Sequence, residues 1–361
     1  MPEPLQPETP PNGPHGPANE NVQAFPPTPP SQPGFTIRVF YGPDGLRAVW
    51  GILLFLGLNQ ALLDCEFALA KALFPRLLST VWFATPGTMV AVEGMVLLAV
   101  AVAAWLMGKI EHRPTAVYGL GGKRRLRNVL AGLGWGVAML SLLVFCLRAT
   151  GLLVFDERLL FGASALRYGA GWLAGFLVVG LFEEYFYRGY LQFTLARGIG
   201  GICRWMHARV SRTQDARSID TNALGFWTAS LLLSFGFGFS HHSNLGESPI
   251  GLLSAGLIGL VFCLSLWRTG SLWWAIGFHA SWDWAQSFLY GVADSGTVLP
   301  GRLFASHPVG RPILSGGLTG PEGSLFILPL VGLIAAIIVL TLPRTHFRCP
   351  SPDDPRGPSL H

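Results

Sequence analysis

Residues 171–190 read GWLAGFLVVGLFEEYFYRGY, a stretch in which two adjacent glutamates and an arginine follow twelve residues without a charge. Such an apolar run is typical of a membrane-spanning helix, because about 20 apolar residues in helical form cross the roughly 30 Å hydrocarbon layer. Seven other segments of the chain have the same character. The eight predicted spans are approximately 44–63, 86–107, 129–149, 168–192, 223–243, 250–268, 271–291 and 325–343. We therefore expect an all-α fold, a polytopic membrane helix bundle of about eight transmembrane helices.

The composition of the whole chain agrees with a membrane protein. Of its 361 residues, 50% are hydrophobic and only 12% are charged, about half the charged share of a soluble protein. A soluble enzyme, a disordered protein and a disulfide scaffold are therefore poor fits. The net charge of +5 does not indicate a nucleic-acid partner, because the basic residues lie between long apolar runs, as topology signals do. Membrane lipid is the expected surrounding.

The two ends of the chain differ from its apolar middle. Residues 1–34 hold 12 of the 27 prolines, and such a segment cannot bury enough apolar surface to fold. We expect a disordered, Pro-rich cytoplasmic tail over 1–36, a transmembrane bundle over 37–345 and a short cytoplasmic tail over 346–361. The first tail lacks the basic and apolar regions of a signal peptide, so no cleavage is expected.

The lysines and arginines predict the orientation of the bundle. When the connections after the second and fourth spans, both tails and Arg268 are placed on one side, that side holds 17 of the 25 basic residues. Basic residues concentrate in cytoplasmic loops. Both termini are therefore expected in the cytoplasm, which an even number of spans allows.

Three polar clusters lie inside the predicted spans or at their ends. Ionisable side chains at membrane depth are costly, so each cluster is a candidate functional site. The first is EEYFYR at 183–188, the second is FGFSHHSN at 237–244, and the third is HASWD at 279–283. All three lie between residues 168 and 291.

The spacing within the clusters suggests how their members are used. Glu184 and Arg188 are four residues apart with the acid first, the favourable order for an ion pair on a helix face, and a purely structural pair is one interpretation. Glu183 is rotated by about 100° from Glu184 and lacks that cation, as suits a general base. His279 and Asp283 also share a helix face.

His241 completes the set of candidate groups. Phe237 precedes it by four residues, so its ring is expected to pack behind the imidazole. One carboxylate and two imidazoles from three helices suffice to activate a water and stabilise an oxyanion. The predicted spans nevertheless separate the depths of Glu183 and His241 by up to about 10 Å.

In this order and on separate helices, the clusters resemble the signature of the CPBP family. These intramembrane proteases include CAAX prenyl endopeptidases and bacteriocin-processing or immunity proteins. The family pattern is EExxxR, then FxxxH, then HxxxN or HxxxD, and the resemblance covers about 168–291. It falls on Glu183, Glu184 and Arg188, on Phe237 and His241, and on His279 and Asp283.

The resemblance implies a role for each matching residue. Glu183 would be the general base on the attacking water, assisted by His241, and His279 with Asp283 would stabilise the oxyanion. Because an ionised carboxylate cannot donate a hydrogen bond, Asp283 would either act protonated or orient His279. Glu184 and Arg188 would hold the architecture. Asn244 also resembles a residue often present in the family.

The expected function is therefore an intramembrane endopeptidase acting on a membrane-associated peptide or protein, prenylated or not. No cofactor is expected; the alternative is zinc held by Glu183, His241 and His279. The alternative functions are a non-catalytic scaffold or immunity protein on the same fold and, third, a proton-coupled transporter. The expected location is a bacterial inner membrane.

Overall fold

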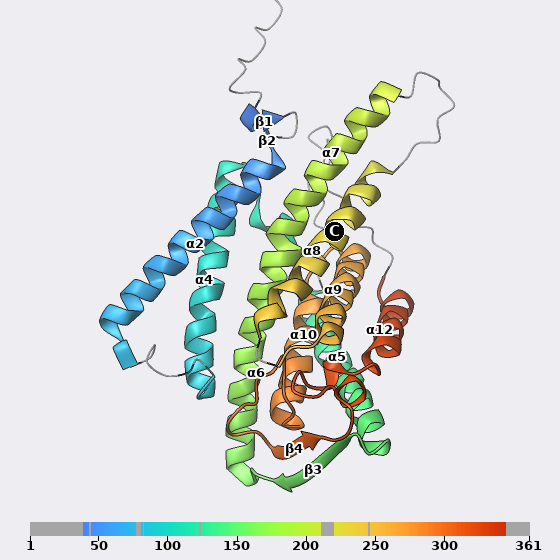
Figure 1. Ribbon diagram of the computed structural model, residues 1–361. Coiled ribbons are helices and arrows are strands. Elements are labelled where there is room, and N and C mark those ends of the chain that lie inside the picture. Colours follow the sequence, from blue (N-terminus) through green and yellow to red (C-terminus); the bar gives the residue numbers. More distant parts are fainter. Residues whose placement is uncertain are drawn as a thin grey trace, which may run out of the picture.

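The computed structural model describes residues 39–343 apart from 43–44, 77–80, 82, 123, 211–219 and 245. This part of the chain is a helical bundle with two small sheets (Figure 1), so the predicted all-α polytopic fold is confirmed. Its main helices are α2 (Ala48–Leu73), α4 (Pro86–Ile110), α5 (Arg125–Ala149), α6 (Gly162–Glu184), α7 (Gln192–Val210), α8 (Thr221–Ser240), α9 (Pro249–Thr269), α10 (Trp273–Trp284) and α12 (Ile327–Thr341). The predicted tails, 1–36 and 346–361, lie outside the described residues.

Local sequence signals set several helix ends. Thr85 and Thr88 form a reciprocal cap before α4, and Pro86 is the first residue of that helix, where its missing N–H costs nothing. Ser248 caps α9 by accepting a hydrogen bond from the N–H of Gly251. Gly270 ends α9 with a φ of +66°, a conformation that glycine adopts without strain.

The fourth predicted span is longer than expected. α6 passes through a π-helical segment, η2 (Tyr185–Leu191), directly into α7, so one continuous helix runs over 48 residues, Gly162–Arg209. The expected end at 192 is wrong, because 193–209 lacks proline and its Arg197 is buried in an ion pair with Glu111 instead of lying in a connection. At 1.5 Å per residue this helix is about 72 Å long, more than twice the hydrocarbon thickness.

The last two predicted spans are shorter than expected. Six helices in the described part of the chain are long and apolar enough to cross a membrane: α2, α4, α5, α6–α7, α8 and α9. α12 has 15 residues, about 22 Å of helix. α10 continues into a π-helical segment, η4 (Ala285–Leu289), and Gly291, with a φ of +64°, follows.

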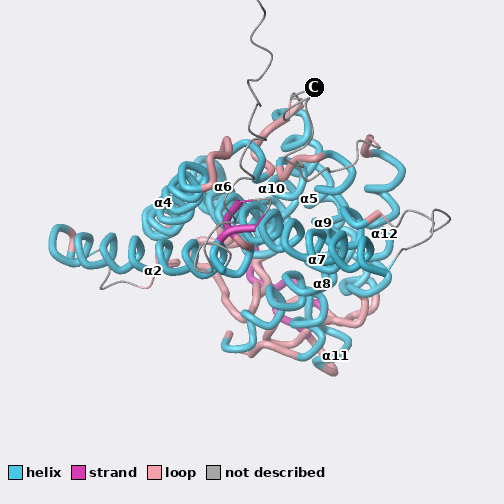
Figure 2. Tube along the Cα trace, turned by 90° about the horizontal axis from the view of Figure 1, so that it is seen from above, coloured by secondary structure: helices cyan, strands magenta, loops and turns pink. Residues whose placement is uncertain are grey.

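Small residues allow the closest helix packing. On α5, a Cβ added to Gly132 or Gly136 would meet backbone atoms of α10, and one added to Gly277 on α10 would meet the backbone of α5. These two helices are thus in direct backbone contact. Seen along the bundle (Figure 2), α2 and α4 lie on one side, and α2 extends outward from the rest.

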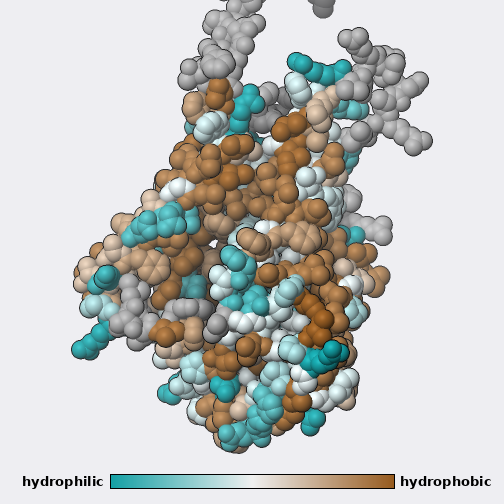
Figure 3. Space-filling model, viewed as in Figure 1, coloured by the Kyte–Doolittle hydropathy of each residue, from teal (hydrophilic) through white to brown (hydrophobic). Residues whose placement is uncertain are grey.

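The bundle has two distinct ends (Figure 1). One carries β1 (Tyr41–Gly42) and β2 (Gly45–Leu46); the other carries β3 (Leu153–Arg158), paired antiparallel with the distant β4 (Phe304–Pro308). Figure 3 shows a mainly apolar surface in the upper part of the molecule and many polar side chains at the lower, β3–β4 end. The end with β1 and β2 is called the basic end, because it gathers ten of the described lysines and arginines: Arg47, Lys109, Arg113, Arg124, Arg125, Arg127, Arg197, Arg204, Arg209 and Arg268.

Candidate active site

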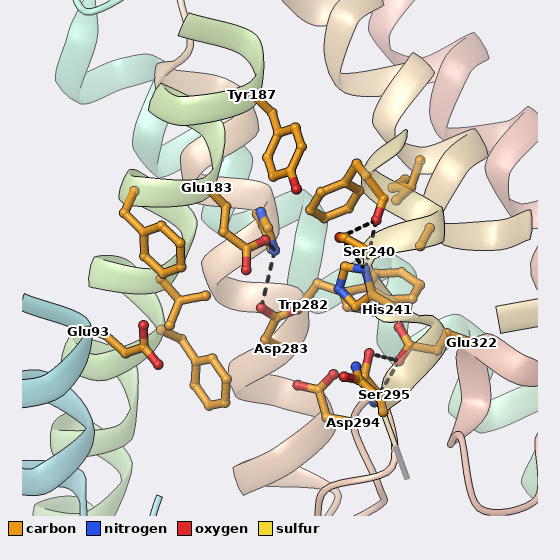
Figure 4. A pocket seen from close by; sticks show the side chains of 18 of the residues that line it. Glu93, Glu183, Tyr187, Ser240, His241, Trp282, Asp283, Asp294, Ser295 and Glu322 are labelled. Atoms are coloured by element: carbon orange, nitrogen blue, oxygen red, sulfur yellow. Dashed lines mark hydrogen bonds and ion pairs between the residues drawn. The ribbon is translucent and has the colours of Figure 1, made fainter. Parts of the chain in front are cut away.

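A cavity of about 620 Å³ lies among α4, α6, α9 and α10 and beneath the end of α8. It is lined by Glu183, His241, His279 and Asp283, the four predicted catalytic residues. Figure 4 shows Glu183, His241 and Asp283 around this space. Three separate segments of sequence thus bring their polar side chains to one space inside the bundle. The sequence clusters therefore form one site.

Glu183 and His241 line the same cavity despite the predicted difference in depth, and the extended helix α6–α7 accounts for this. Gly225 of α8 lies against the backbone of Ala196 and Gly200 on α7. From that level, about 15 residues of α6–α7 lead back to Glu183 and 16 residues of α8 lead forward to His241. The two helices therefore run back over similar numbers of residues from this contact, which brings both side chains to the one cavity.

The predicted ion pair of Glu184 and Arg188 is formed. Arg188 Nη1 lies 3.1 Å from Glu184 Oε1, and the side chains are only 2% and 0% exposed. The guanidinium carbon also lies 4.3 Å from the ring centroid of Phe237, within range of a cation–π interaction. This pair joins α6 to the end of α8.

Glu184 has a second partner that the spacing alone did not reveal. His279 Nδ1 lies 3.1 Å from the same Oε1 atom. A carboxylate can only accept, so Nδ1 carries the proton in this bond. The ring is thereby oriented with Nε2 toward the other two carboxylates, 3.6 Å from Glu183 Oε2 and 3.4 Å from Asp283 Oδ2.

His241 is oriented by the backbone of its own helix. Its Nδ1 lies 2.9 Å from the carbonyl oxygen of Phe237, which fixes the proton on Nδ1 and leaves Nε2 as an acceptor. The Phe237 ring packs edge-on against the imidazole at 4.9 Å between centroids, as the spacing predicted. Asn244 also lines the cavity, and its N–H donates to the His241 carbonyl oxygen at 2.9 Å.

Both helices that carry motif carboxylates change to π-helical geometry immediately afterwards. η2 begins directly after Glu184, and η4 begins two residues after Asp283. π-Helical turns are rare and occur often at functional sites. In this bundle they turn the following residues to different faces from those that regular helix would give.

Other acidic residues line the cavity and were missed from the sequence. Glu93 of α4 lies on the far side of the space from His241, Asp294 lies below Asp283, and Glu322 lies on the side of His241 (Figure 4). Glu322 Oε1 accepts hydrogen bonds from Ser295, at 2.8 Å from its N–H and 3.0 Å from its hydroxyl. Glu93 could have been predicted from the sequence, because it is a carboxylate inside a predicted span. Asp294 and Glu322 lie in connections between the helices, where an acidic residue does not stand out.

Two carboxyl groups in the connections near the cavity titrate abnormally. Burial raises the pKa of Asp294 well above its ordinary value of 3.8, and the neighbouring carboxylates Asp283 and Glu322 raise it further. The Ser287 hydroxyl opposes this shift by donating to Asp294 Oδ2 at 2.9 Å. Burial also raises the pKa of Glu247. Part of the mouth of the cavity is therefore less negative near neutral pH than its composition suggests.

The described residues were also compared with the requirements of a metal centre. Among them, no three His, Cys, Asp or Glu side chains form a group that could hold a metal ion. Glu183, His241 and His279, the donors of the alternative zinc site, are not arranged as such a set.

The fold and the site define a polytopic α-helical membrane protein with carboxylates and imidazoles gathered in its interior. Residues 165–285 match the family model described as type II CAAX prenyl endopeptidase Rce1-like. This segment holds every motif residue, and the match supports membership of the CPBP/CAAX family of intramembrane proteases. No curated protein and no solved structure matches the chain.

Proposed function

We propose that the protein is an intramembrane endopeptidase in which Glu183 is the general base. The main supporting observation is that Glu183, His241 and His279, from three helices, line one cavity. The two imidazoles are held in place by hydrogen bonds from their Nδ1 atoms to neighbouring oxygens. A water between Glu183 and His241 Nε2 gives its proton to Glu183 as its oxygen attacks the scissile carbonyl carbon. The carbonyl oxygen then becomes the oxyanion.

The remaining groups serve the tetrahedral intermediate. His279 Nε2, protonated, donates to the oxyanion, and a buried donor of this kind is worth about 10²–10³ in rate. Asp283, whose Oδ2 lies 3.4 Å from the same Nε2, favours the charged form of the ring and holds its orientation; this use needs no proton on the carboxylate. As the C–N bond breaks, Glu183 returns its proton to the departing amine nitrogen, which leaves a carboxylic acid and an amine.

Glu184 and Arg188 are proposed to position His279 rather than to touch substrate. The guanidinium holds Glu184 Oε1 at 3.1 Å, and the same atom accepts from His279 Nδ1. Phe237 supports both sides of the site, because its ring lies over Arg188 and against His241. Asn244 supports His241 from the chain that follows.

The test is cleavage of a fluorogenic peptide set by the purified full-length protein in detergent, with farnesylated and unmodified members. Glu183→Gln should reduce cleavage at least about 100-fold, the smallest usual contribution of a general base. Glu157→Gln, on exposed β3, is the matched control and should retain it. A strong chelator should leave wild-type cleavage unchanged, and loss with chelator would instead support a metalloenzyme.

An uncleaved peptide set would favour the non-catalytic scaffold or immunity protein. Full activity in Glu183→Gln would refute the assignment of the base. Whether substrates are prenylated is an outcome of the same peptide set. The bacterial inner membrane, with both termini in the cytoplasm, stays the predicted location.

A further inference from the structure

The oxyanion of the proposed reaction has a single donor, the proton on His279 Nε2. The two carboxylates near that atom belong to Glu183, at 3.6 Å, and Asp283, at 3.4 Å. Glu183 holds the proton that the departing amine receives, and Asp283 acts without a proton and cannot donate. Oxyanion sites commonly direct more than one donor at the developing charge. A second donor is therefore expected among the other groups that line the cavity.

The hydroxyl groups of the cavity differ in whether the protein already uses them. Four serine hydroxyls that line it donate to an oxygen of the protein at 2.7–3.0 Å: Ser240, Ser254, Ser287 and Ser295. Within the described part of the chain, the hydroxyls of Tyr187 and Thr297 have no such bond, although both residues line the cavity. Thr297 lies in the connection after η4, whereas Tyr187 lies one helical turn after Glu183.

The position of Tyr187 directs its hydroxyl toward the catalytic residues. It follows Glu183 by four residues, a separation that places two side chains on one face of a helix. It is also the third residue of the π-helical segment η2 and is half-buried. Figure 4 shows its hydroxyl pointing into the space between Glu183 and His241. The phenol therefore reaches the part of the cavity in which the attacked carbonyl group is expected.

Aromatic contacts hold the Tyr187 ring in this position. Its centroid lies 5.0 Å from that of Phe186 and 5.1 Å from that of Phe237, and both contacts are edge-on. The Phe237 ring also lies 4.9 Å from the His241 ring and 6.4 Å from the His279 ring. One phenylalanine therefore packs against the tyrosine and both imidazoles. A donor fixed in this way needs little reorganisation when charge develops beside it.

We propose that the Tyr187 hydroxyl is the second donor to the oxyanion, together with His279 Nε2. This inference rests on the proposed protease function, because the acceptor is the former carbonyl oxygen of the scissile bond. The phenol keeps its proton throughout and donates a hydrogen bond that strengthens as the oxygen becomes negative. Tyr187 is then a catalytic residue, and its hydroxyl supplies the donor that an ionised Asp283 cannot provide.

The first test is the kinetics of Tyr187→Phe, which removes only the hydroxyl. The purified full-length protein in detergent should lose about 10²–10³-fold in kcat, the usual effect of losing one oxyanion donor. KM should stay near the wild-type value, because the bond forms mainly in the transition state. Tyr185→Phe, at a neighbouring tyrosine that is buried outside the cavity, is the matched control. Thr297→Val removes the competing hydroxyl, and both controls should keep the wild-type kcat.

The second test compares two uncleavable analogues of one substrate peptide. A phosphinic peptide carries a charged oxygen where the oxyanion forms, and an ethylene isostere has no oxygen there. Tyr187→Phe should weaken inhibition by the phosphinic peptide at least about 10-fold, in line with a transition-state contact, and should leave inhibition by the isostere unchanged. Equal weakening of both would assign Tyr187 to the binding of the uncleaved substrate or to the fold, and would overturn the proposal.

The kinetic outcomes separate this inference from the protease function. Wild-type kcat in Tyr187→Phe, or an equal loss in Thr297→Val, would refute the role of Tyr187 alone. A loss of kcat accompanied by a lower Tm or an altered size-exclusion profile would show a structural role and would also refute it. If the wild type cleaves no peptide, the proposed protease function fails, and the role of Tyr187 fails with it.

Discussion

Removing the cation from the buried pair is the sharpest perturbation that the site offers. In Arg188→Met the methionine fills most of the arginine stem, but Glu184, which is 0% exposed, loses the guanidinium 3.1 Å away. At an effective dielectric of 20, two unit charges at that distance interact by about 5 kcal/mol. Breaking one side of a buried ion pair typically costs about 3–5 kcal/mol, and we expect a loss of that size.

The double variant Glu184→Gln with Arg188→Met removes both charges together. It leaves no isolated charge, and the glutamine oxygen can still accept from His279 Nδ1. We therefore expect it to lose at least about 2 kcal/mol less than the sum of the two single variants, since paired groups in contact are coupled. Arg167→Met, exposed on α6, should stay within about 0.5 kcal/mol of wild type.

The measurement is thermal unfolding in detergent micelles, followed by tryptophan fluorescence, with size-exclusion chromatography to confirm folded protein. Using the usual shift of about 2–4 °C per kcal/mol for mid-sized domains, Arg188→Met should lower the Tm on the order of 10 °C. A loss below about 1 kcal/mol, or a double variant no better than additive, would refute the reasoning. Either result would mean that solvent or lipid headgroups reach this pair.

Two further variants test packing and titration. Gly136→Ala should destabilise by about 1–3 kcal/mol, because its new Cβ would meet the backbone of Phe278 on α10. The control is Gly134→Ala, two residues away, where an added Cβ would meet nothing within 4 Å, and it should not destabilise in the same unfolding assay. An equal loss of stability in the two variants would contradict the close packing of Gly136 on α10. The pKa of Asp294 is higher in the folded protein than its ordinary value of 3.8. Protonated Asp294 therefore stabilises the folded state fully below pH 3.8, and this stabilisation is lost as the pH rises through the raised pKa. Asp294→Asn should lack this decline in a series of Tm values from pH 4 to 9, and an unchanged pH dependence would argue against it.

The sequence predicted those parts of the site that depend on spacing within one helix. The ion pair of Glu184 with Arg188 and the packing of Phe237 on His241 both follow from a separation of four residues. The link from Glu184 to His279 joins residues 95 positions apart, and its formation depends on how α6 and α10 pack. Nothing in local periodicity reports that.

Span lengths were predicted least well for a physical reason. Hydropathy measures how apolar a segment is, and it does not tell whether the segment is surrounded by lipid or by protein. The second half of α6–α7 carries Arg197, which is buried against Glu111 and so continues as helix where the charge predicted a connection. At α12, an apolar segment of 15 residues packs beside α9 without the length of a full crossing.

The π-helical segment η2 also determines where the chain can lose a residue without loss of its helix packing. A regular helix advances by about 100° per residue, so deleting one residue within Tyr185–Leu191 would turn α7 by that angle relative to α6. Gly198, against Ala48 of α2, and Gly200, against α8, would then leave their contacts together. A single-residue deletion at any of these seven positions should destabilise the fold. A deletion in the exposed connection between β3 and α6 should be tolerated, because it rotates no helix against its neighbours. Among related sequences, insertions and deletions of single residues should therefore be absent from Tyr185–Leu191, since each would rotate α7 relative to α6.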